Sequence, residues 1–350
     1  MPAPARAERP GRPRQTDIAR LSGVSVSTVS RALAGEPGIS AGARSAVAKA
    51  AAELGYPLPP GFAGGDGATL EGLAFDVLLP AERATGDLGP FYQDILDGLR
   101  AAADACRFRV AVRLLADDVL RARDLERCGV DGVFVVGLDL DEAAMPGYAD
   151  ARPLVLVNGA DPSLALDCVS PANFYGGRLG ARTLLDLGHR RIAYVAGQHR
   201  HTTRERARGF RHAVAELADA AGFEGVLTFS GRTFEEAAAK TRELLLHQPD
   251  ITAVFCMNDA IALGVLSALE ALGLSVPDDV SVLGFDDLPC ASLMSPRLST
   301  LFVDRRALAH EAVDVMRHRL AEPAAPARQV QHAVRLVEGG TIAAAKATLP

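Results

Sequence analysis

The sequence lacks the features that would direct the chain to a membrane or out of the cell. It contains no run of about 18 apolar residues, so a membrane-spanning helix is excluded. Its first residues, MPAPARAERPGRPRQ, are basic but lack the apolar stretch that a secretory signal needs. We therefore expect a cytoplasmic protein without a membrane partner.

The common catalytic signatures are also missing. The chain holds no G-x-G-x-x-G, no G-x-x-x-x-G-K-S/T, no H-E-x-x-H and no G-x-S-x-G. His199 and His201 have no cysteine or carboxylate cluster at a metal-binding spacing, so a polar loop is the simpler interpretation. The five cysteines are odd in number and scattered, which indicates reduced thiols. We expect no enzyme activity, no cofactor and no metal.

Charge is distributed unevenly along the 350 residues. The chain has 37 Lys and Arg against 43 Asp and Glu, a formal charge of −6. Residues 1–60 carry +4, and the rest of the chain carries −10. Such a division favours a polyanion-binding module attached to a body that repels polyanions. At about 100–200 residues per domain, the length indicates two or three domains.

Three short helical patterns follow one another near the amino terminus. Thr16, Ser25 and Ser40 each precede an apolar stripe and are expected to cap these helices. Leu21 is expected to face inward in the first helix, and Val29 in the second.

The first two of these helices have the layout of a helix-turn-helix. A turn that contains glycine separates them, and the second helix begins with small polar residues, as a recognition helix in the major groove does. Val26 can contact a thymine methyl group, Ser27 can donate or accept, and Arg31 can reach guanine O6 and N7. Phosphate contacts are expected from Thr16, Ser25, Thr28 and Ser30.

Beyond residue 70, short apolar runs alternate with amphipathic segments of helix length, which is typical of parallel sheets covered by helices. The predicted strands are 73–79, 109–115, 132–136 and 154–157 in a first block, and 192–196, 226–229, 253–257 and 280–285 in a second. The two blocks predict two open α/β subdomains with a crevice between them. Asn258 and Asp286 follow predicted strands, at the edge where such sheets bind ligands.

Residues 16–56 resemble the head of the LacI/GalR (lactose repressor) family, whose pattern runs D-V/I-A-x-x-A/S-G-V-S-x-x-T-V-S-R-x-L-N. In the body, LGHRRIAYVAG, the Arg-x-x-Gly-Phe of 206–210, the segment 255–287 and SPRLSTLFVD are similar to that family's effector domain. The resemblance implies a DNA-binding transcription regulator, usually a repressor, that acts as a homodimer on a pseudo-palindromic operator. It also implies a body like that of periplasmic sugar-binding proteins, with a small-molecule effector between two doubly wound subdomains and three chain crossings.

The same resemblance implies which side chains contact the effector. They are the polar and aromatic residues Phe91, Tyr92, Arg200, Thr202, Arg206, Phe234, Asn258 and Asp286. A sugar is the expected effector, because such polar groups hold neighbouring hydroxyls in pairs. The set is also similar to that of purine-responsive members of the family, so a purine remains an alternative effector. Asp259 is expected to cap the helix that follows it, and Phe91 and Tyr92 could equally pack within their helix.

The segment PLPPGFAGGDG at 57–67 departs from the family pattern P-N-x-x-A-R-x-L, which folds into a short helix on DNA. The segment has neither the Ala-Arg pair nor the leucine of that pattern, and glycine and proline oppose helix formation by about 1 and 3 kcal/mol per residue. We therefore predict that this chain lacks the leucine that its relatives insert into the minor groove and that it binds its operator chiefly through the helix-turn-helix domains. Another departure is Ala172-Asn173, where the family often has Asp-Asn.

The predicted organisation has five parts. They are a disordered tail at 1–14, the helix-turn-helix domain at 15–56, a linker at 57–69, a first subdomain at 70–160 plus 290–320, and a second at 161–289 plus 321–350. A periplasmic-type sugar-binding protein without a DNA role would explain the body, but it would need a signal peptide and no basic head. An enzyme on a doubly wound scaffold is disfavoured by the missing motifs.

Overall fold

The computed structural model describes residues 13–34, 39, 41–58, 68–86, 88–140, 148, 152–196, 200–221, 224–229 and 233–346. The chain divides into two compact units, Met1–Leu70 with Arg317–Ala324 and Glu71–Met316 with Ala325–Pro350. Several features predicted above lie outside the described residues: the tail up to residue 12, the cap at Ser40, His199, and most of the linker, including the predicted lack of a minor-groove leucine. No helix of the described chain is long and apolar enough to span a membrane.

In the first unit, the helices α1 (Gln15–Ser22), α2 (Val26–Leu33) and α3 (Ala41–Leu54) pack around a small apolar core. The prediction for Ser25 is confirmed, because its Oγ accepts a hydrogen bond from the Thr28 N–H at 3.1 Å and caps α2. The prediction for Thr16 is wrong. Arg14 stands at the cap position of α1, where its N–H donates to Asp17 Oδ2 at 2.9 Å.

The core of the first unit is built from one face of each helix. Ile18, Val29 and Val47 are completely buried there. Leu21 was expected to join them but is 45% exposed. The reason is local: α1 ends at Ser22 and the chain turns at Gly23, whose φ of 71° is left-handed, so Leu21 lies beside the turn.

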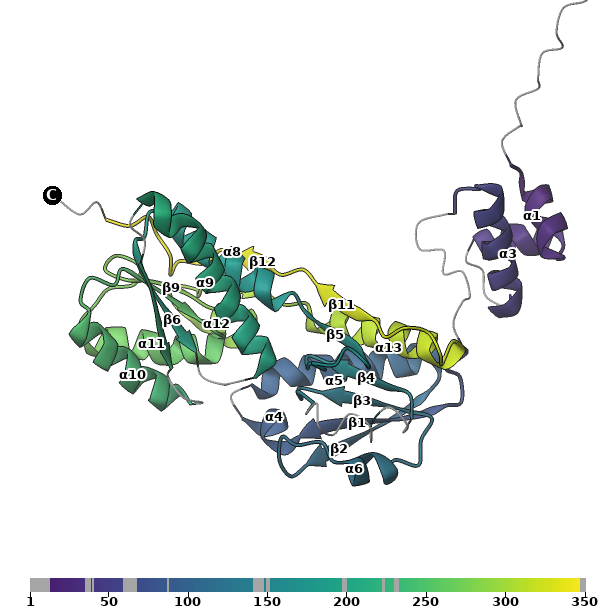
Figure 1. Cartoon of the computed structure of the whole chain (residues 1–350), viewed down its shortest axis with the longest axis horizontal. Coiled ribbons are helices and arrows are strands. Elements are labelled where there is room, and N and C mark those ends of the chain that lie inside the picture. The colour runs from purple at the N-terminus through teal and green to yellow at the C-terminus, as the bar shows by residue number, and fades with distance from the viewer. Residues whose placement is uncertain are drawn as a thin grey trace, which may run out of the picture. The chain divides into compact units, whose positions relative to one another are not determined.

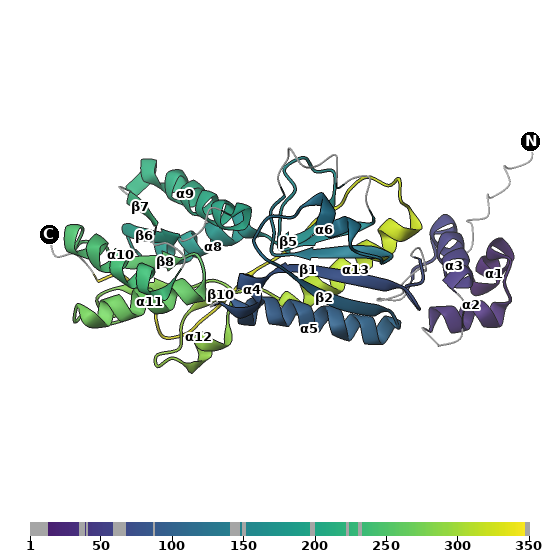
Figure 2. The same ribbon diagram turned by 90° about the horizontal axis from the view of Figure 1, so that it is seen from below.

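The first sheet of the second unit is entirely parallel, in the order β11-β5-β4-β3-β1-β2. Its strands are β1 (Ala74–Pro80), β2 (Arg109–Leu115), β3 (Gly132–Val136), β4 (Leu154–Val157), β5 (Asp167–Pro171) and β11 (Gln329–His332). Figure 2 shows α5 (Gly89–Cys106) on one side of β1 and β2 and α6 (Ala122–Glu126) on the other. The short α4 (Ala81–Thr85) follows β1 directly, and α5 packs closely on α13 (Arg305–Ala321).

The second sheet has the order β7-β6-β8-β9 and is also parallel. Its strands are β6 (Arg191–Ala196), β7 (Glu224–Phe229), β8 (Ala253–Cys256) and β9 (Ser281–Leu283). The helices α8 (Asn173–Asp186) and α9 (His201–Ala221) pack together on one face, and α10 (Phe234–His247) and α11 (Asp259–Ala271) on the other (Figure 1). The described part of the unit also contains an antiparallel pair of β10 (Thr300–Phe302) and β12 (Arg335–Val337) and the short α12 (Pro289–Leu293).

All eight predicted strands are present, within a few residues of the expected bounds. The expected boundaries between the subdomains differ from the sheets. Residues 167–171 and 329–332 were assigned to the second subdomain, yet β5 pairs with β4 and β11 pairs with β5, which places both in the first sheet. Ser299, assigned to the first subdomain, forms a bridge with Leu283 of the second sheet. The sequence did not reveal these pairings, because the segments are too short and polar to show a strand pattern.

In the residues that the structure describes, the chain passes from one sheet to the other at three places. β5 of the first sheet leads directly into α8 on the second, and β9 leads through α12 and β10 back to α13 beside the first. After β11, the chain continues through β12 to Thr341, whose carbonyl accepts from the Val282 N–H of β9 at 2.7 Å. Each subdomain is therefore built from separate stretches of sequence.

Candidate DNA-binding surface and effector crevice

One face of α1 and α2 is polar and open. Most of the side chains predicted to contact DNA are accessible: Thr16, Ser25, Val26, Ser27, Ser30 and Arg31 are exposed and Thr28 is half-buried. Val26 is 44% exposed although it is apolar, whereas Val29, one turn further along α2, is completely buried. The helix thus separates a core face from a face that can enter a groove.

The hydroxyl groups at the start of α2 are held by one another. Ser25 Oγ lies 2.9 Å from Ser27 Oγ and 2.8 Å from Thr28 Oγ1. Each hydroxyl can donate or accept, so the cluster can turn its donors toward phosphate or base atoms without moving the backbone. The amino-terminal end of α2 adds the partial positive charge of its free N–H groups.

In the second unit, Arg206 is the centre of a buried polar cluster. Its side chain is 6% exposed and Nη2 lies 3.1 Å from Asp286 Oδ1, in an ion pair. Nε donates to Asn173 Oδ1 at 2.8 Å, and Nη1 donates to the carbonyl of Met257 at 2.6 Å. The guanidinium also lies over the ring of Phe285, 3.6 Å from its centroid. The cluster presents acceptors and donors side by side, as hydroxyl recognition requires.

Arg200 joins the second subdomain to the first. It stands directly before α9, and its guanidinium donates to the hydroxyl of Tyr92 at 2.9 Å and to the carbonyl of Asn158 at 2.6 Å. Nη2 also lies 3.4 Å from Asp139 Oδ1, and Asp139 Oδ2 accepts from the His201 N–H at 2.5 Å. These bonds cross the crevice between the sheets.

The cavity at this place has a volume of only about 30 Å³. It is lined by Leu88, Phe91, Tyr92, Asn158, Arg200, Thr202, Thr203, Arg206, Met257, Asn258 and Asp286. Seven of the eight predicted effector residues meet there. Phe234 does not, because it begins α10 and lines a separate cavity of about 310 Å³ with Pro90 and Leu288. A cavity of this size has room for little more than water, so side chains fill most of the crevice.

The roles of two neighbouring residues differ from expectation. Asn258, not Asp259, caps α11, since Asn258 Oδ1 accepts from the Ile261 N–H at 2.9 Å. Asp259 is fully buried instead, where Oδ2 accepts from the Leu288 N–H at 2.7 Å and Oδ1 lies 2.6 Å from Thr300 Oγ1. It thereby fixes the loop that carries Asp286.

Burial dominates the protonation of these carboxyls. It raises the pKa of Asp259 to about 8, with a further contribution from the nearby charge of Asp286. Burial also raises the pKa of Asp286, although the guanidinium groups of Arg206 and Arg305 oppose the shift. A ligand that donates hydrogen bonds to Asp286 would replace part of the hydration that the carboxylate has lost.

Three crevice residues were missed by the sequence analysis. Asn158 directly follows β4, Asp139 follows β3, and Asn173 begins α8 and bonds Arg206. The rule that led to Asn258 and Asp286 also selects Asn158 and Asp139, because both stand at the carboxyl ends of parallel strands. Asn173 was noted only as part of a departure from the family pattern.

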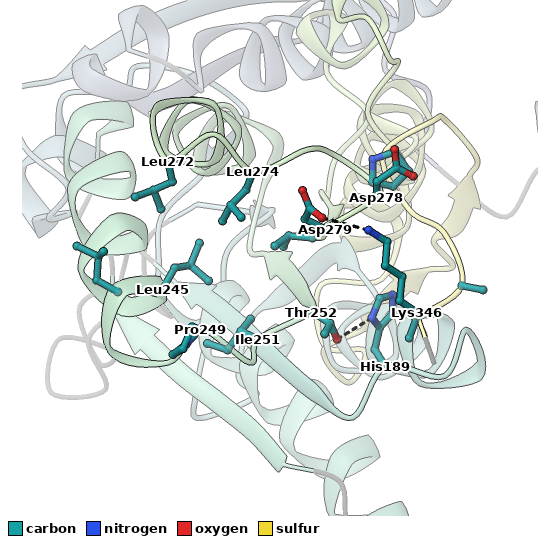
Figure 3. A pocket seen from close by; sticks show the side chains of 15 residues that line it. His189, Leu245, Pro249, Ile251, Thr252, Leu272, Leu274, Asp278, Asp279 and Lys346 are labelled. Atoms are coloured by element: carbon teal, nitrogen blue, oxygen red, sulfur yellow. Dashed lines mark hydrogen bonds and ion pairs between the residues drawn. The ribbon is translucent and has the colours of Figure 1, made fainter. Parts of the chain in front are cut away.

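A larger cavity, of about 460 Å³, lies at the opposite edge of the second sheet (Figure 3). His189, Thr252 and Val280, which line it, precede β6, β8 and β9 rather than follow them. His189 Nδ1 is 2.9 Å from Thr252 Oγ1, and Lys346 forms an ion pair with Asp279 at 3.1 Å. The cavity is therefore distinct from the crevice, and four of its polar side chains are bonded in pairs.

Within the described ranges, no group of three or more His, Cys, Asp or Glu side chains is arranged to hold a metal ion. Cys128, Cys168 and Cys256 are buried, and burial raises the pKa of Cys168 to about 12, so this thiol stays protonated.

Comparison with known proteins gives two matches to family models. Residues 16–57 match the model described as bacterial regulatory proteins, lacI family, and residues 181–342 match a periplasmic binding protein-like domain. The ribose operon repressor of Escherichia coli strain K12 is 31% identical over 340 residues, covering 93% of this chain and 98% of that protein.

Two solved structures are similar over nearly the whole chain. A complex of the transcriptional regulator CelR with cellobiose has a TM-score of 0.66 and 26% identity, covering 94% of this chain and 100% of that one. A lac repressor dimer bound to operator and an anti-inducer has a TM-score of 0.66 and 26% identity, covering 95% of this chain and 100% of the other.

Proposed function

The chain belongs to the LacI family of bacterial regulatory proteins, and on that premise we propose that it is a cytoplasmic repressor whose operator affinity is set by a sugar in the crevice of its second unit. The family consists of DNA-binding regulators, and the chain is such a regulator. We assign operator contacts to the open face of α1 and α2, and effector contacts to the crevice residues.

The observation that carries the effector proposal is the polar cluster around Arg206. Arg206, Asp286 and Asn173 form a connected set of donors and acceptors that is almost closed to water. Adjacent hydroxyl groups of a sugar can bridge such a set with paired hydrogen bonds. Phe91 and Tyr92 supply an apolar wall for the C–H face of a sugar ring.

The crevice favours a polyol over a flat base. A purine is held best between apolar or aromatic groups on both faces of its ring. Phe234, which would form the second wall, lines a different cavity, so the described crevice has aromatic rings on one side.

The bonds of Arg200 suggest how the effector acts. A cavity of about 30 Å³ is too small for a sugar, so the ligand must displace part of the bridge from Arg200 to Tyr92 and Asp139. Displacement changes how the two subdomains are held together, and in a homodimer it alters the spacing of two helix-turn-helix domains on a palindromic operator. The regulator then responds because the effector binds one arrangement better than the other.

A thermal-shift measurement on the full chain tests the effector class. D-ribose, cellobiose and hypoxanthine are titrated separately, and a ligand that binds the folded protein raises its melting temperature. We expect a shift with at least one sugar. A shift with hypoxanthine alone would make a purine the effector in place of a sugar. The absence of any shift would count against both effector classes.

Operator binding is tested separately by mobility-shift titration against fragments of genomic DNA. We expect selective complexes whose affinity falls steeply as salt increases, because phosphate contacts release counterions. Binding without sequence preference would contradict an operator-specific role, whatever the thermal shifts show.

A further inference from the structure

A second buried arginine, Arg305, lies close to the crevice but does not line it. It is the first residue of α13, and its side chain is 9% exposed. A guanidinium so deeply buried needs several hydrogen-bond partners to compensate for lost hydration. Its partners come from both sides of the crevice.

On the first subdomain, Arg305 is bonded to α5. Its Nε donates to Asp94 Oδ2 at 2.8 Å, and its charge lies 5.7 Å from the centre of the Phe91 ring. Asp94 follows Phe91 and Tyr92 by less than one turn of the same helix. Movement of Arg305 therefore acts on the helix that supplies the aromatic wall.

On the other side, Arg305 holds the loop that carries the crevice carboxylate. Nη1 donates to the carbonyls of Asp286 and Val303, and Nη2 donates to the carbonyl of Asp287 at 3.3 Å. Asp286 and Asp287 have φ values of 105° and 51°, a left-handed backbone that non-glycine residues adopt at a cost. Such a backbone persists only where its surroundings hold it, and Arg305 supplies several of those bonds.

We propose that Arg305 is a positioning residue that couples the effector-binding loop at Asp286 and Asp287 to helix α5 of the first subdomain. The proposal deepens the proposed function and rests on it. Occupancy of the crevice changes the bonds of Asp286. The backbone carbonyl of Asp286 accepts from Nη1 of the Arg305 guanidinium, and Nε of the same rigid, planar group donates to Asp94. A shift of the loop is therefore passed on to α5. Lysine cannot replace Arg305, because a single ammonium group lacks the planar set of donors of a guanidinium.

Hydrogen exchange on the ligand-free full chain tests the coupling without any effector. Asp286→Asn removes the carboxylate of residue 286 from the loop, and we expect it to change exchange of the α5 amides near Asp94 by about threefold or more. In an Arg305→Met background the same substitution should leave α5 unchanged. A residue with a purely structural role would alter both baselines but would not abolish this transmission.

The matched control is Arg297→Met. Arg297 bonds the same loop, through Asp287 Oδ1 at 3.1 Å, but its side chain is 44% exposed. In this background Asp286→Asn should still change the exchange of the α5 amides. Arg305→Lys, by contrast, should behave like Arg305→Met. Should Arg305→Met fail to fold, Asp94→Ala removes only the α5 end of the link and should also abolish the transmission.

A second arm measures the response to ligand, with D-ribose and cellobiose as probes. In Arg305→Met, the fold-change in operator affinity caused by a bound sugar should shrink toward one. If neither sugar binds the wild-type chain, the sugar proposal fails while the exchange arm still decides the role of Arg305. If Asp286→Asn alters α5 equally with and without Arg305, the coupling role is refuted.

Discussion

At the scale of single residues, Asp259 shows how an apparently ordinary helix-start residue can support a site. Both of its oxygens are engaged, by Leu288 and Thr300, and it is completely buried. Gly284 is needed beside it, since a Cβ there would lie 2.2 Å from Asp259 Oδ1. The carboxyl thus holds together two stretches that follow Asp286, at Leu288 and at Thr300.

The raised pKa of Asp259, about 8, gives a stability prediction. A carboxyl that binds its proton more tightly when folded stabilises the protein fully below its ordinary pKa of 3.8, and this contribution is lost as the pH rises through about 8. Asp259→Asn removes the titration. The pH dependence of the unfolding free energy, measured with urea between pH 4 and 8, should flatten by up to roughly 1 kcal/mol per pH unit. An unchanged pH profile would show that Asp259 titrates normally.

Arg31 gives a prediction for DNA recognition. It is exposed on α2, four residues after Ser27, where a guanidinium can reach a guanine edge. Arg31→Ala should weaken operator binding by about 1–3 kcal/mol and relax the preference at one base pair. Binding is measured against operators changed one position at a time, and equal weakening on every sequence would make Arg31 a phosphate contact instead.

The candidate site was predictable from sequence only in part. Asn258 and Asp286 follow from strand ends, and the resemblance supplied the arginines. The bridge from Arg200 to Asp139 depends on which loops face each other across two sheets, which no local pattern encodes. Phe234 was placed with the crevice because relatives use it so, yet here the start of α10 directs it into another cavity.

At the scale of elements, the backbones of α8 and α9 lie unusually close to each other. A Cβ at Gly177 of α8 would lie 1.9 Å from the carbonyl oxygen of Arg206, and one at Gly209 of α9 would lie 1.9 Å from that of Phe174. The backbones of α8 and α9 therefore touch without intervening side chains. This contact sets the position of α9, which carries Thr202 and Arg206 into the crevice.

Gly209→Ala should therefore damage both stability and the site. The methyl group forces α9 away from α8, at a cost of about 1–3 kcal/mol or more, and displaces Arg206. Urea denaturation and ligand-dependent melting shifts measure the two effects. Gly129→Ala is the matched control, because a Cβ there meets no atom within 4 Å. Equal stability of the two variants would mean that the helices can separate freely.

The elements found from sequence and those missed differ in composition. β3 and β4, GVFVV and LVLV, are completely buried and read as strands at once. β5 and β11, DCVSP and QVQH, are as well paired but contain polar residues, and β11 lies at the sheet edge with alternate residues exposed. Their strand character comes from pairing with distant residues, which composition does not reveal.

At the scale of the whole molecule, the division of charge has a functional meaning. The amino-terminal 60 residues carry +4 and the remainder −10, so attraction to DNA is confined to the helix-turn-helix end of the chain. The body supplies the response to effector without adding nonspecific affinity for phosphate.

Coupling between the two units is reciprocal by thermodynamic necessity. If a sugar changes the operator affinity by a given factor, the operator must change the sugar affinity by the same factor, in the same direction. Calorimetric titration of the sugar with and without saturating operator measures one side, and operator titration with and without sugar the other. Unequal factors would show that the two ligands do not share one equilibrium.

The three crossings of the chain also govern how the protein is made. The first sheet begins at β1 but its edge strand β11 is synthesised only after the whole second sheet. A nascent chain stopped before Gln329 would present β5 as an unpaired, partly apolar edge, which invites pairing with other chains. We therefore expect prematurely terminated products to aggregate. They should not persist as truncated proteins that bind operators without responding to the effector.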